Sequence, residues 1–321
     1  MYKMDHLYEP VEYTIKLGGK NTRGFIIKYI QNLLCNDENS ITKLIIDDIN
    51  CFHNASLIID DIQDKSEMRR GQLCAYKVYG SAFTINAGYL QCFNLINGLK
   101  KRYPKEISNE VKNYFLNALE TIHIGQGNDL YWTKEKIIPS KQDYYMMIDN
   151  KTGILFKLIG QLCLLSVNNI YTFTNEYKKN VLYLLQLMGR FFQIRDDYIN
   201  ITSPVYWRSK VFCEDFDEKK VSYFFVQHKE ITNNDDLYQE LISKKNITKK
   251  DKLYFYEKMY NNNILHRGYI DLNNYKNEII AIEKKITQKE KMSEFLEMFF
   301  KKLEFNAPLH IKNVKLIMNI I

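Results

Sequence analysis

Three aspartates and two arginines stand close together early in the chain. Asp60 and Asp64 are four residues apart, so on a helix they share one face, and Asp61 lies beside them. Carboxylates crowded in this way repel one another unless cations neutralise them. Oxygen ligands suit Mg²⁺, which commonly bridges one or two carboxylates to substrate phosphates. Arg69 and Arg70 follow with forked donors for phosphate oxygens, so the segment predicts a magnesium-dependent phosphate site.

A second acidic pair, Asp196 and Asp197, lies much further along the chain in another apolar segment. Asn200 stands four residues after Asp196 and is a weaker ligand that binds through its oxygen. Gln193 precedes the pair by about one helical turn. Charged groups on the inner face of a helix need partners or metals. The two clusters together therefore predict Mg²⁺ ions between two facing helices, with one diphosphate bound through them.

An earlier acidic pair provides an internal comparison. Asp47 and Asp48 also follow two isoleucines, but position 51 is a cysteine and no arginine pair follows. We therefore expect this pair to be structural or to lie on the surface.

The elements that position these groups are predicted to be helices. Apolar residues recur at helical spacing from Leu44 to Ile59. Prolines are few, and Pro104, Pro139 and Pro204 fall where loops would separate long helices. No series of short alternating strands with hairpin turns is present. The sequence predicts an all-α fold with all 321 residues in a single domain.

The composition is that of an ordinary globular protein, with 45% apolar and 26% charged residues. Much of the net charge of +7 comes from lysine-rich stretches, which we interpret as solvated helix faces and loops. No zinc spacing, aromatic RNA-binding run or basic region leading into heptads accompanies this charge. We therefore expect no nucleic-acid partner.

Cysteine usage and hydropathy bear on the compartment. The six cysteines have no C-x-x-C spacing, which favours reduced, buried thiols and a cytoplasmic location. Residues 1–10 lack the apolar core of a signal peptide. The longest apolar stretch, residues 154–167, is interrupted by Lys157 and is too short to span a bilayer. We expect no stable membrane insertion.

The two clusters belong to a wider set of motifs. These are Gly18-Gly19-Lys20-Asn21-Thr22-Arg23, His53 through Gly71, Gly125-Gln126-Gly127 with Asp129 and Tyr131-Trp132, Asp149-Asn150-Lys151-Thr152-Gly153, Phe191 through Asn200, and Phe212-Cys213-Glu214-Asp215. From about residue 14 to about residue 230, the chain resembles the trans-isoprenyl diphosphate synthase family. Within that family, the animal and fungal geranylgeranyl diphosphate synthases are most similar.

The resemblance implies an antiparallel helical bundle around a deep central cavity, and a homo-oligomer that is usually a dimer. It also implies that three Mg²⁺ ions per active site are held against an allylic diphosphate by Asp60, Asp61, Asp64, Asp196 and Asp197. The same diphosphate is expected to bind Arg69, Lys151, Thr152, Gln193, Lys210 and Lys220. Isopentenyl diphosphate is expected to bind Lys20, Arg23, His53 and Arg70.

The implied reaction condenses isopentenyl diphosphate with farnesyl diphosphate, or a shorter allylic diphosphate, to give geranylgeranyl diphosphate. Metals and cations neutralise the leaving diphosphate, the C–O bond breaks, and the second substrate's double bond attacks the allylic cation. Product length has a steric interpretation, because the small residues Ala55 and Ser56 stand one turn before Asp60. If these residues form the bottom of the cavity, a C20 chain can extend past them. Alternatively, their small size only allows two helices to pack closely.

Several positions depart from the family's pattern. The proline and histidine that usually follow Arg70-Gly71 are absent. Ile154 replaces a usual glycine, Asn128 replaces an apolar residue, and Lys219-Lys220-Val221-Ser222-Tyr223-Phe224 stands where the family has Gly-Lys-x-Ser-x-Pro. Bulky residues at positions that usually have special backbone requirements suggest reshaped loops and a changed cavity.

These departures leave two other functions open. One is a class I terpene synthase, making a diterpene or sesquiterpene, that ionises and cyclises geranylgeranyl or farnesyl diphosphate. Such an enzyme needs the metals but no isopentenyl diphosphate site, so the retained basic residues of that site favour elongation. The other is a non-catalytic regulatory subunit of a prenyl synthase. That subunit is expected to lose an aspartate cluster, and both clusters are retained here.

Overall fold

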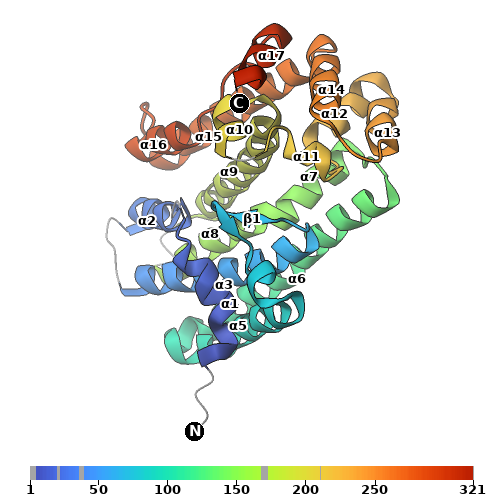
Figure 1. Cartoon of the computed structure of the whole chain (residues 1–321). Coiled ribbons are helices and arrows are strands. Elements are labelled where there is room, and N and C mark those ends of the chain that lie inside the picture. The colour runs from blue at the N-terminus through green and yellow to red at the C-terminus, as the bar shows by residue number, and fades with distance from the viewer. Residues whose placement is uncertain (1–4, 20–21, 36–39, 168–172, 210, 321) are drawn as a thin grey trace. The chain divides into compact units, whose positions relative to one another are not determined.

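The structure, a computed structural model, describes residues 5–19, 22–35, 40–167, 173–209 and 211–320. The chain divides into two compact units. Unit 1 comprises Met1–Glu120 and Leu155–Leu182, and unit 2 comprises Thr121–Ile154 and Tyr183–Ile321. Within each unit the described residues are almost entirely helical (Figure 1). Two predicted diphosphate-binding residues, Lys20 and Lys210, lie outside the described residues.

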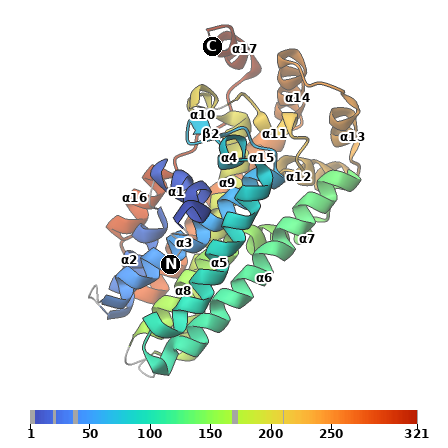
Figure 2. The same ribbon diagram turned by 60° about the horizontal axis from the view of Figure 1, so that its bottom comes forward.

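The helices of unit 1 gather around α3, which packs against α1, α2 and α5 (Figures 1 and 2). In chain order the unit contains η1 (Asp5–Tyr8), α1 (Glu9–Lys16), α2 (Thr22–Cys35), α3 (Ser40–Gln63), β1 (Met68–Arg69), β2 (Gln72–Leu73), α4 (Ala75–Tyr79), α5 (Ser81–Arg102), the first part of α6 (Lys105–Glu135), most of α8 (Ile154–Ser166) and the start of α9 (Asn175–Thr202). Along α3, fully buried apolar residues recur every three or four positions, as the sequence predicts: Ile45, Ile49, Phe52, Ala55 and Ile58.

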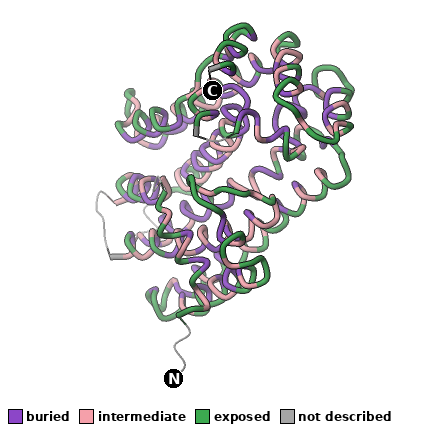
Figure 3. The backbone as a smooth tube through the Cα atoms, viewed as in Figure 1, coloured by how far each residue is buried: buried purple, intermediate pink, exposed green. Residues whose placement is uncertain are grey.

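In unit 2, α12 packs against α7 and α15, and α14 packs against α15 and α17. The unit contains the remainder of α6 and α9 with α7 (Lys141–Ile148), the π-helix η2 (Asp149–Gly153), α10 (Pro204–Ser209), α11 (Glu214–Asp217), α12 (Tyr223–Thr232), α13 (Asp236–Ser243), α14 (Lys249–Asn261), α15 (Ile264–Thr287), α16 (Glu294–Lys302) and α17 (Ile311–Ile320). Figure 3 shows buried positions alternating with exposed ones along these helices. Phe191 of α9 contributes to the core by packing its ring against those of Phe299, Phe300 and Phe305.

Helices α3 and α5 approach each other closely at Ala55 and Gly88. A Cβ atom on Gly88 would lie 3.3 Å from the carbonyl oxygen of Ala55 and 2.9 Å from Cδ1 of Ile59. Ala55 is fully buried at this approach, which favours the second of the two interpretations that the sequence left open, and its place in the cavity wall stays a prediction. Ser56 differs, because it is only half-buried and its hydroxyl donates to the carbonyl oxygen of His53 in the same helix, at 2.9 Å.

A two-stranded hairpin interrupts the helices after α3. Its turn consists of Arg70 and Gly71, whose φ angles are 55° and 80°. Such paired left-handed residues form the two-residue turn that matches the twist of antiparallel strands. Each strand has only two residues, too few to give a strand periodicity in the sequence. The hairpin folds Arg69 back toward the end of α3.

The prediction of an all-α fold is confirmed, with this hairpin as the single sheet among the described residues. Pro104 lies between α5 and α6, Pro139 between α6 and α7, and Pro204 begins α10 directly after α9, as predicted. In the part of the chain that the structure describes, no helix combines the length and hydropathy needed to cross a bilayer. The single domain and its central cavity stay predictions.

The comparison pair of aspartates has a structural role, as expected. Asp48 is fully buried and forms an ion pair with Arg102, whose Nη1 lies 2.7 Å from Oδ1. Burial raises the pKa of Asp48 to about 6, and the charge of Arg102 opposes that shift. The pair therefore stabilises the packing of α3 against the end of α5.

The six cysteines are all free thiols, as predicted. Four of them are buried: Cys74, Cys92, Cys163 and Cys213. Cys35 and Cys51 are only half-buried, so burial was predicted too widely.

Candidate active site

The first aspartate cluster lies at the end of α3 in unit 1. The backbone N–H of Asp64 donates to the carbonyl oxygen of Asp60 at 2.8 Å, so both residues belong to one helical turn, as their spacing predicts. Asp61 is buried and accepts a hydrogen bond from Nε of Arg69 at 2.9 Å. The same guanidinium lies 3.7 Å from Oδ2 of Asp60. Arg69 thus neutralises part of the cluster, and its contact with a diphosphate stays a prediction.

The cluster fits a magnesium ion that is bound jointly with a phosphate. Oδ2 of Asp61 is buried and has no hydrogen-bond partner among the described residues, which leaves a carboxylate oxygen without a compensating donor. No three acidic, thiol or imidazole side chains in the described ranges form a complete metal cage. Mg²⁺ does not require such a cage, because it keeps several waters and binds through one or two carboxylates together with substrate phosphates.

A basic cluster in unit 1 consists of Arg23, His53 and Arg70. Burial lowers the pKa of His53 well below its usual value, and the charges of Arg23, Arg70 and Arg69 lower it further. Burial, with the charge of Arg70, also lowers the pKa of Arg23 to about 10, and Nε of Arg23 is buried without a hydrogen-bond partner. The two guanidinium groups repel each other, which favours the binding of an anion beside them. The structure thus brings together three of the four residues predicted to bind isopentenyl diphosphate.

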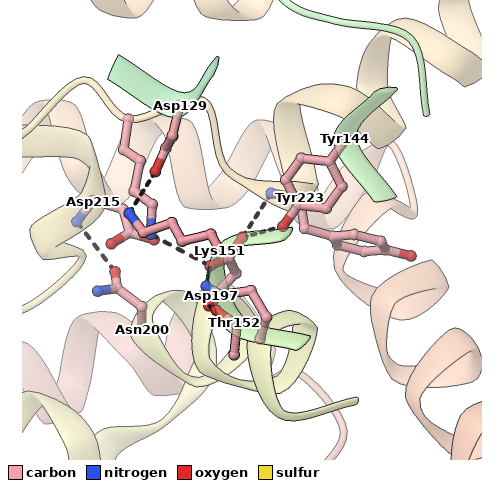
Figure 4. A network of polar contacts seen from close by, with 10 residues as sticks. Asp129, Tyr144, Lys151, Thr152, Asp197, Asn200, Asp215 and Tyr223 are labelled. Atoms are coloured by element: carbon pink, nitrogen blue, oxygen red, sulfur yellow. Dashed lines mark hydrogen bonds and ion pairs between the residues drawn. The ribbon is translucent and has the colours of Figure 1, made fainter. Parts of the chain in front are cut away.

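The second aspartate pair, on α9 in unit 2, has two unlike members. Asp196 is exposed, whereas Asp197 is 2% exposed and contacts four donors. The Tyr144 hydroxyl and the Tyr223 backbone N–H donate to Oδ2 at 2.7 and 2.9 Å (Figure 4). Nε2 of Gln193 donates to Oδ1 at 3.0 Å. The fourth donor is Nζ of Lys220, which lies 3.6 Å from Oδ1. These contacts make Asp197 an anchor, and its binding of metal stays a prediction.

Lys220 lies among three buried acids. Burial lowers the pKa of its ammonium, but the charges of Asp197, Asp215 and Asp129 outweigh that effect and hold the pKa well above its usual value. Burial conversely raises the pKa of Asp215 well above normal, with Lys220 opposing the shift. Lys220 therefore stays positively charged inside unit 2, as a residue that binds a diphosphate must.

The π-helix η2 presents Lys151 and Thr152, the other predicted diphosphate ligands on this side. Nζ of Lys151 lies 2.7 Å from Oδ2 of Asp129, and the hydroxyl of Thr152 donates to Oε1 of Gln193 at 2.6 Å. Gln193 therefore links Thr152 to Asp197. π-Helical turns are frequent at functional sites, because they break the regular helix to aim particular side chains.

The start of η2 is fixed to α9 by a charged pair. Arg190 donates from Nε and Nη2 to the two carboxylate oxygens of Asp149, at 2.7 and 2.6 Å. Gln186 donates to the same carboxylate at 2.7 Å. Two-pronged pairing of this kind sets orientation as well as distance. It holds η2 against the helix that carries the second aspartate pair.

Close packing also fixes η2 against α6, at Gly125. A Cβ atom at that position would lie 2.4 Å from the backbone nitrogen of Lys151 and 2.7 Å from the carbonyl carbon of Asn150. Real Cβ atoms do not approach backbone so closely, so glycine is required here. Gly125 thereby allows Lys151 to reach Asp129, one turn further along α6.

The structure adds residues that the sequence analysis did not assign to the site. Tyr144 and Tyr223 hold Asp197, Asp129 holds Lys151, and Asp149 holds η2. Tyr144 precedes Lys151 by seven residues, about two helical turns, so both lie on the same helix face. This spacing is the one sequence feature that could have placed Tyr144 near the site. No sequence feature could have indicated Tyr223, because it contacts Asp197 through its backbone N–H.

Asn200, predicted as a weaker metal ligand, also contributes to packing, and its binding of metal stays a prediction. It is buried, and its side-chain oxygen accepts a hydrogen bond from the backbone N–H of Asp215 at 3.3 Å (Figure 4). This hydrogen bond holds α11 against α9.

Comparison with known proteins places these motifs in context. A family model described as polyprenyl synthetase matches residues 4–259. The chain is 38% identical over 217 residues to the geranylgeranyl pyrophosphate synthase janG of Penicillium janthinellum, covering 67% of this chain and 55% of that protein. It is 37% identical over 219 residues to the geranylgeranyl pyrophosphate synthase atmG of Aspergillus flavus, covering 68% and 60%.

Terpene synthases are also among the relatives. The chain is 37% identical over 218 residues to ophiobolin F synthase of Aspergillus calidoustus, covering 68% of this chain but 29% of that protein. The chain thus spans between 29% and 60% of the length of these three relatives.

Among solved structures, a crystal structure of geranylgeranyl pyrophosphate synthase has a TM-score of 0.77 at 18% identity. The match covers 94% of this chain and 91% of that one. At this level of identity the likeness establishes the fold, which is the all-α isoprenoid synthase fold.

The close approach at Gly125 gives a testable prediction. Gly125→Ala should displace η2, because its Cβ meets backbone atoms that have no free rotation, and should cost about 1–3 kcal/mol of folding stability. Calorimetric unfolding and the turnover rate measure the two effects. Gly127→Ala is the matched control, since a Cβ there meets nothing within 4 Å on the same helix. Equal behaviour of the two variants would contradict the packing argument.

Proposed function

The chain belongs to the polyprenyl synthetase family, and from that membership we propose that it is a magnesium-dependent trans-prenyltransferase. It condenses isopentenyl diphosphate with farnesyl diphosphate, or a shorter allylic diphosphate, to give geranylgeranyl diphosphate. Relatives named geranylgeranyl pyrophosphate synthase, at 37% and 38% identity, support this product. Because the chain covers only part of each relative, the activity is proposed from its own residues as well.

The observation that carries the proposal is the basic cluster of Arg23, His53 and Arg70. Elongation needs a second diphosphate site for isopentenyl diphosphate, whereas cyclisation of one substrate does not. Two guanidinium groups, beside an imidazole whose pKa is lowered by burial and by their charges, are suited to an anion at this point. Lys20 is proposed as a fourth ligand of the same diphosphate.

For the allylic diphosphate, we propose that the two aspartate clusters are its ligands through three Mg²⁺ ions. When bound, the ions neutralise the diphosphate and make it a competent leaving group. The proposed ligands are Asp60, Asp61, Asp64, Asp196 and Asp197. The unpartnered oxygen of Asp61 and the exposure of Asp196 support this assignment.

The basic residues of unit 2 complete the proposed reaction. Lys151 and Lys220, held by Asp129 and Asp197, present positive charge to the departing diphosphate together with Arg69, Gln193, Thr152 and Lys210. The residues that hold isopentenyl diphosphate orient its double bond toward the allylic cation, which makes the attack effectively intramolecular. No protein nucleophile is needed, and the released diphosphate accepts the proton lost at the end.

A second candidate, a class I terpene synthase, is favoured by the match to ophiobolin F synthase. The matched segment is under a third of that protein, so the match does not assign the activity of the whole protein to this chain. A regulatory subunit is disfavoured because both aspartate clusters are retained. Elongation therefore remains the function that the residues support best.

We further propose that the enzyme is a cytoplasmic homodimer. Ile85, Tyr89 and Phe93 recur every four residues along α5, and their exposed fractions are 38%, 40% and 58%. Exposed apolar side chains on one helix face are typical of an interaction surface. A second copy of the chain is the proposed partner.

One assay tests the proposed function. Purified protein with Mg²⁺ should convert farnesyl diphosphate into a C20 diphosphate only when isopentenyl diphosphate is present, and chelation of the metal should stop turnover. Product analysis by mass spectrometry measures both effects. A hydrocarbon formed from geranylgeranyl diphosphate alone would establish the terpene synthase instead.

Single substitutions should separate the two diphosphate sites. Asp60→Ala and Asp196→Ala should each abolish turnover, because both remove an oxygen ligand from the allylic site. His53→Ala should lower only the rate of elongation and raise the KM for isopentenyl diphosphate. Steady-state kinetics with each substrate varied separately measure these effects. Full elongation by His53→Ala would count against the assignment of the basic cluster.

Product length should respond to Ser56 and not to Ala55. Ser56→Phe places a bulky ring on a half-buried face and should shorten the product, as measured by chromatography of the hydrolysed products. Ala55→Phe should chiefly lower the unfolding temperature, because Ala55 is fully buried at the close approach of α3 and α5. An unchanged C20 product from a folded Ser56→Phe variant would contradict the assignment of Ser56 to the bottom of the cavity.

A further inference from the structure

We propose that Tyr144 is a positioning residue of the allylic diphosphate site, acting through its hydrogen bond to Asp197. This inference rests on the proposed function, because it concerns the basic residues that bind the allylic diphosphate. Tyr144 lies on α7, outside both aspartate motifs, and its hydroxyl is directed at Oδ2 of Asp197 (Figure 4).

The contact is a buried, charge-assisted hydrogen bond. Tyr144 is 1% exposed, Asp197 is 2% exposed, and 2.7 Å separates the hydroxyl from Oδ2. Hydrogen bonds between a neutral donor and a carboxylate are among the stronger ones in proteins.

Through the carboxylate of Asp197, this contact also affects residues that Tyr144 does not touch. The group is planar, so fixing Oδ2 with two donors, the Tyr144 hydroxyl and the Tyr223 N–H, also fixes the direction of Oδ1. Oδ1 in turn meets Gln193 at 3.0 Å and Lys220 at 3.6 Å. Tyr144 thereby sets the position of two predicted diphosphate ligands that it does not itself touch.

The hydroxyl is separable from the packing of the ring. The Tyr144 ring packs against Tyr145 and Tyr223, with 6.2 Å between ring centroids in each case. A phenylalanine keeps both contacts and loses only the hydrogen bond. Oδ2 then retains a single donor, so the orientation of the carboxylate is less constrained.

Steady-state kinetics of Tyr144→Phe test the proposal. The kcat/KM for farnesyl diphosphate should fall roughly tenfold or more, the loss expected for one hydrogen bond to a charged group. The Mg²⁺ concentration for half-maximal rate should rise. The KM for isopentenyl diphosphate should stay within about twofold, because its proposed ligands belong to the other cluster. A general loss of structure would affect all three quantities together.

Tyr256→Phe is the matched control. Tyr256 is also a fully buried tyrosine of unit 2, and its hydroxyl donates to the carbonyl oxygen of Leu309 at 2.7 Å. Its substitution removes a buried tyrosine hydrogen bond without touching the proposed site. We expect wild-type kinetics from Tyr256→Phe, with a similar drop in unfolding temperature for both variants.

A binding measurement keeps the proposal testable if the proposed reaction is wrong. Calorimetric titration with inorganic pyrophosphate, with and without Mg²⁺, should show metal-dependent binding weakened roughly tenfold in Tyr144→Phe and unchanged in Tyr256→Phe. Equal pyrophosphate binding by wild type and Tyr144→Phe, or equal losses in the two variants, overturns the role of Tyr144. A wild-type protein that binds pyrophosphate but does not elongate overturns only the proposed function.

Discussion

Unit 2 depends on the compensation of one buried negative charge. Removing a carboxylate from water is costly unless hydrogen bonds and opposite charges replace its hydration. Asp197 meets this requirement with donors from α7, from its own helix α9 and from the segment before α12. The carboxylate thereby holds together segments that are far apart in the sequence. A substitution that removes one of these donors affects the position of the others.

The two units differ in how their buried charged groups are compensated. In unit 1, burial and the charges of Arg23 and Arg70 lower the pKa of His53, and Asp61 keeps one oxygen without a donor. In unit 2, the lysines are instead paired with buried acids, as Lys151 is with Asp129. Unit 1 therefore has uncompensated charge that an anion and a cation would satisfy. In unit 2, these ion pairs hold the lysines in fixed positions.

The departures from the family pattern are accommodated by local chemistry. Lys219 has a φ of 54°, a left-handed conformation that costs a side-chain-bearing residue about 1–2 kcal/mol relative to glycine. Its Nζ donates to the carbonyl oxygens of Ile242 and Lys244 at 3.2 and 2.5 Å, at the end of α13. Charge at a helix C-terminus is favourable, which offsets part of that strain. Ile154, at another departure, is buried in the apolar interior.

The sequence by itself determined the helical class and the identity of the acidic and basic groups. Helical periodicity, proline positions and the four-residue spacing of Asp60 and Asp64 are local properties, so they can be inferred from neighbours along the chain. Only the tertiary structure decided which atoms are engaged. It assigned Ala55 to helix packing, Arg69 to the carboxylates, the oxygen of Asn200 to a backbone donor, and Tyr144 to Asp197. These outcomes depend on contacts between residues distant in sequence, which no local spacing encodes.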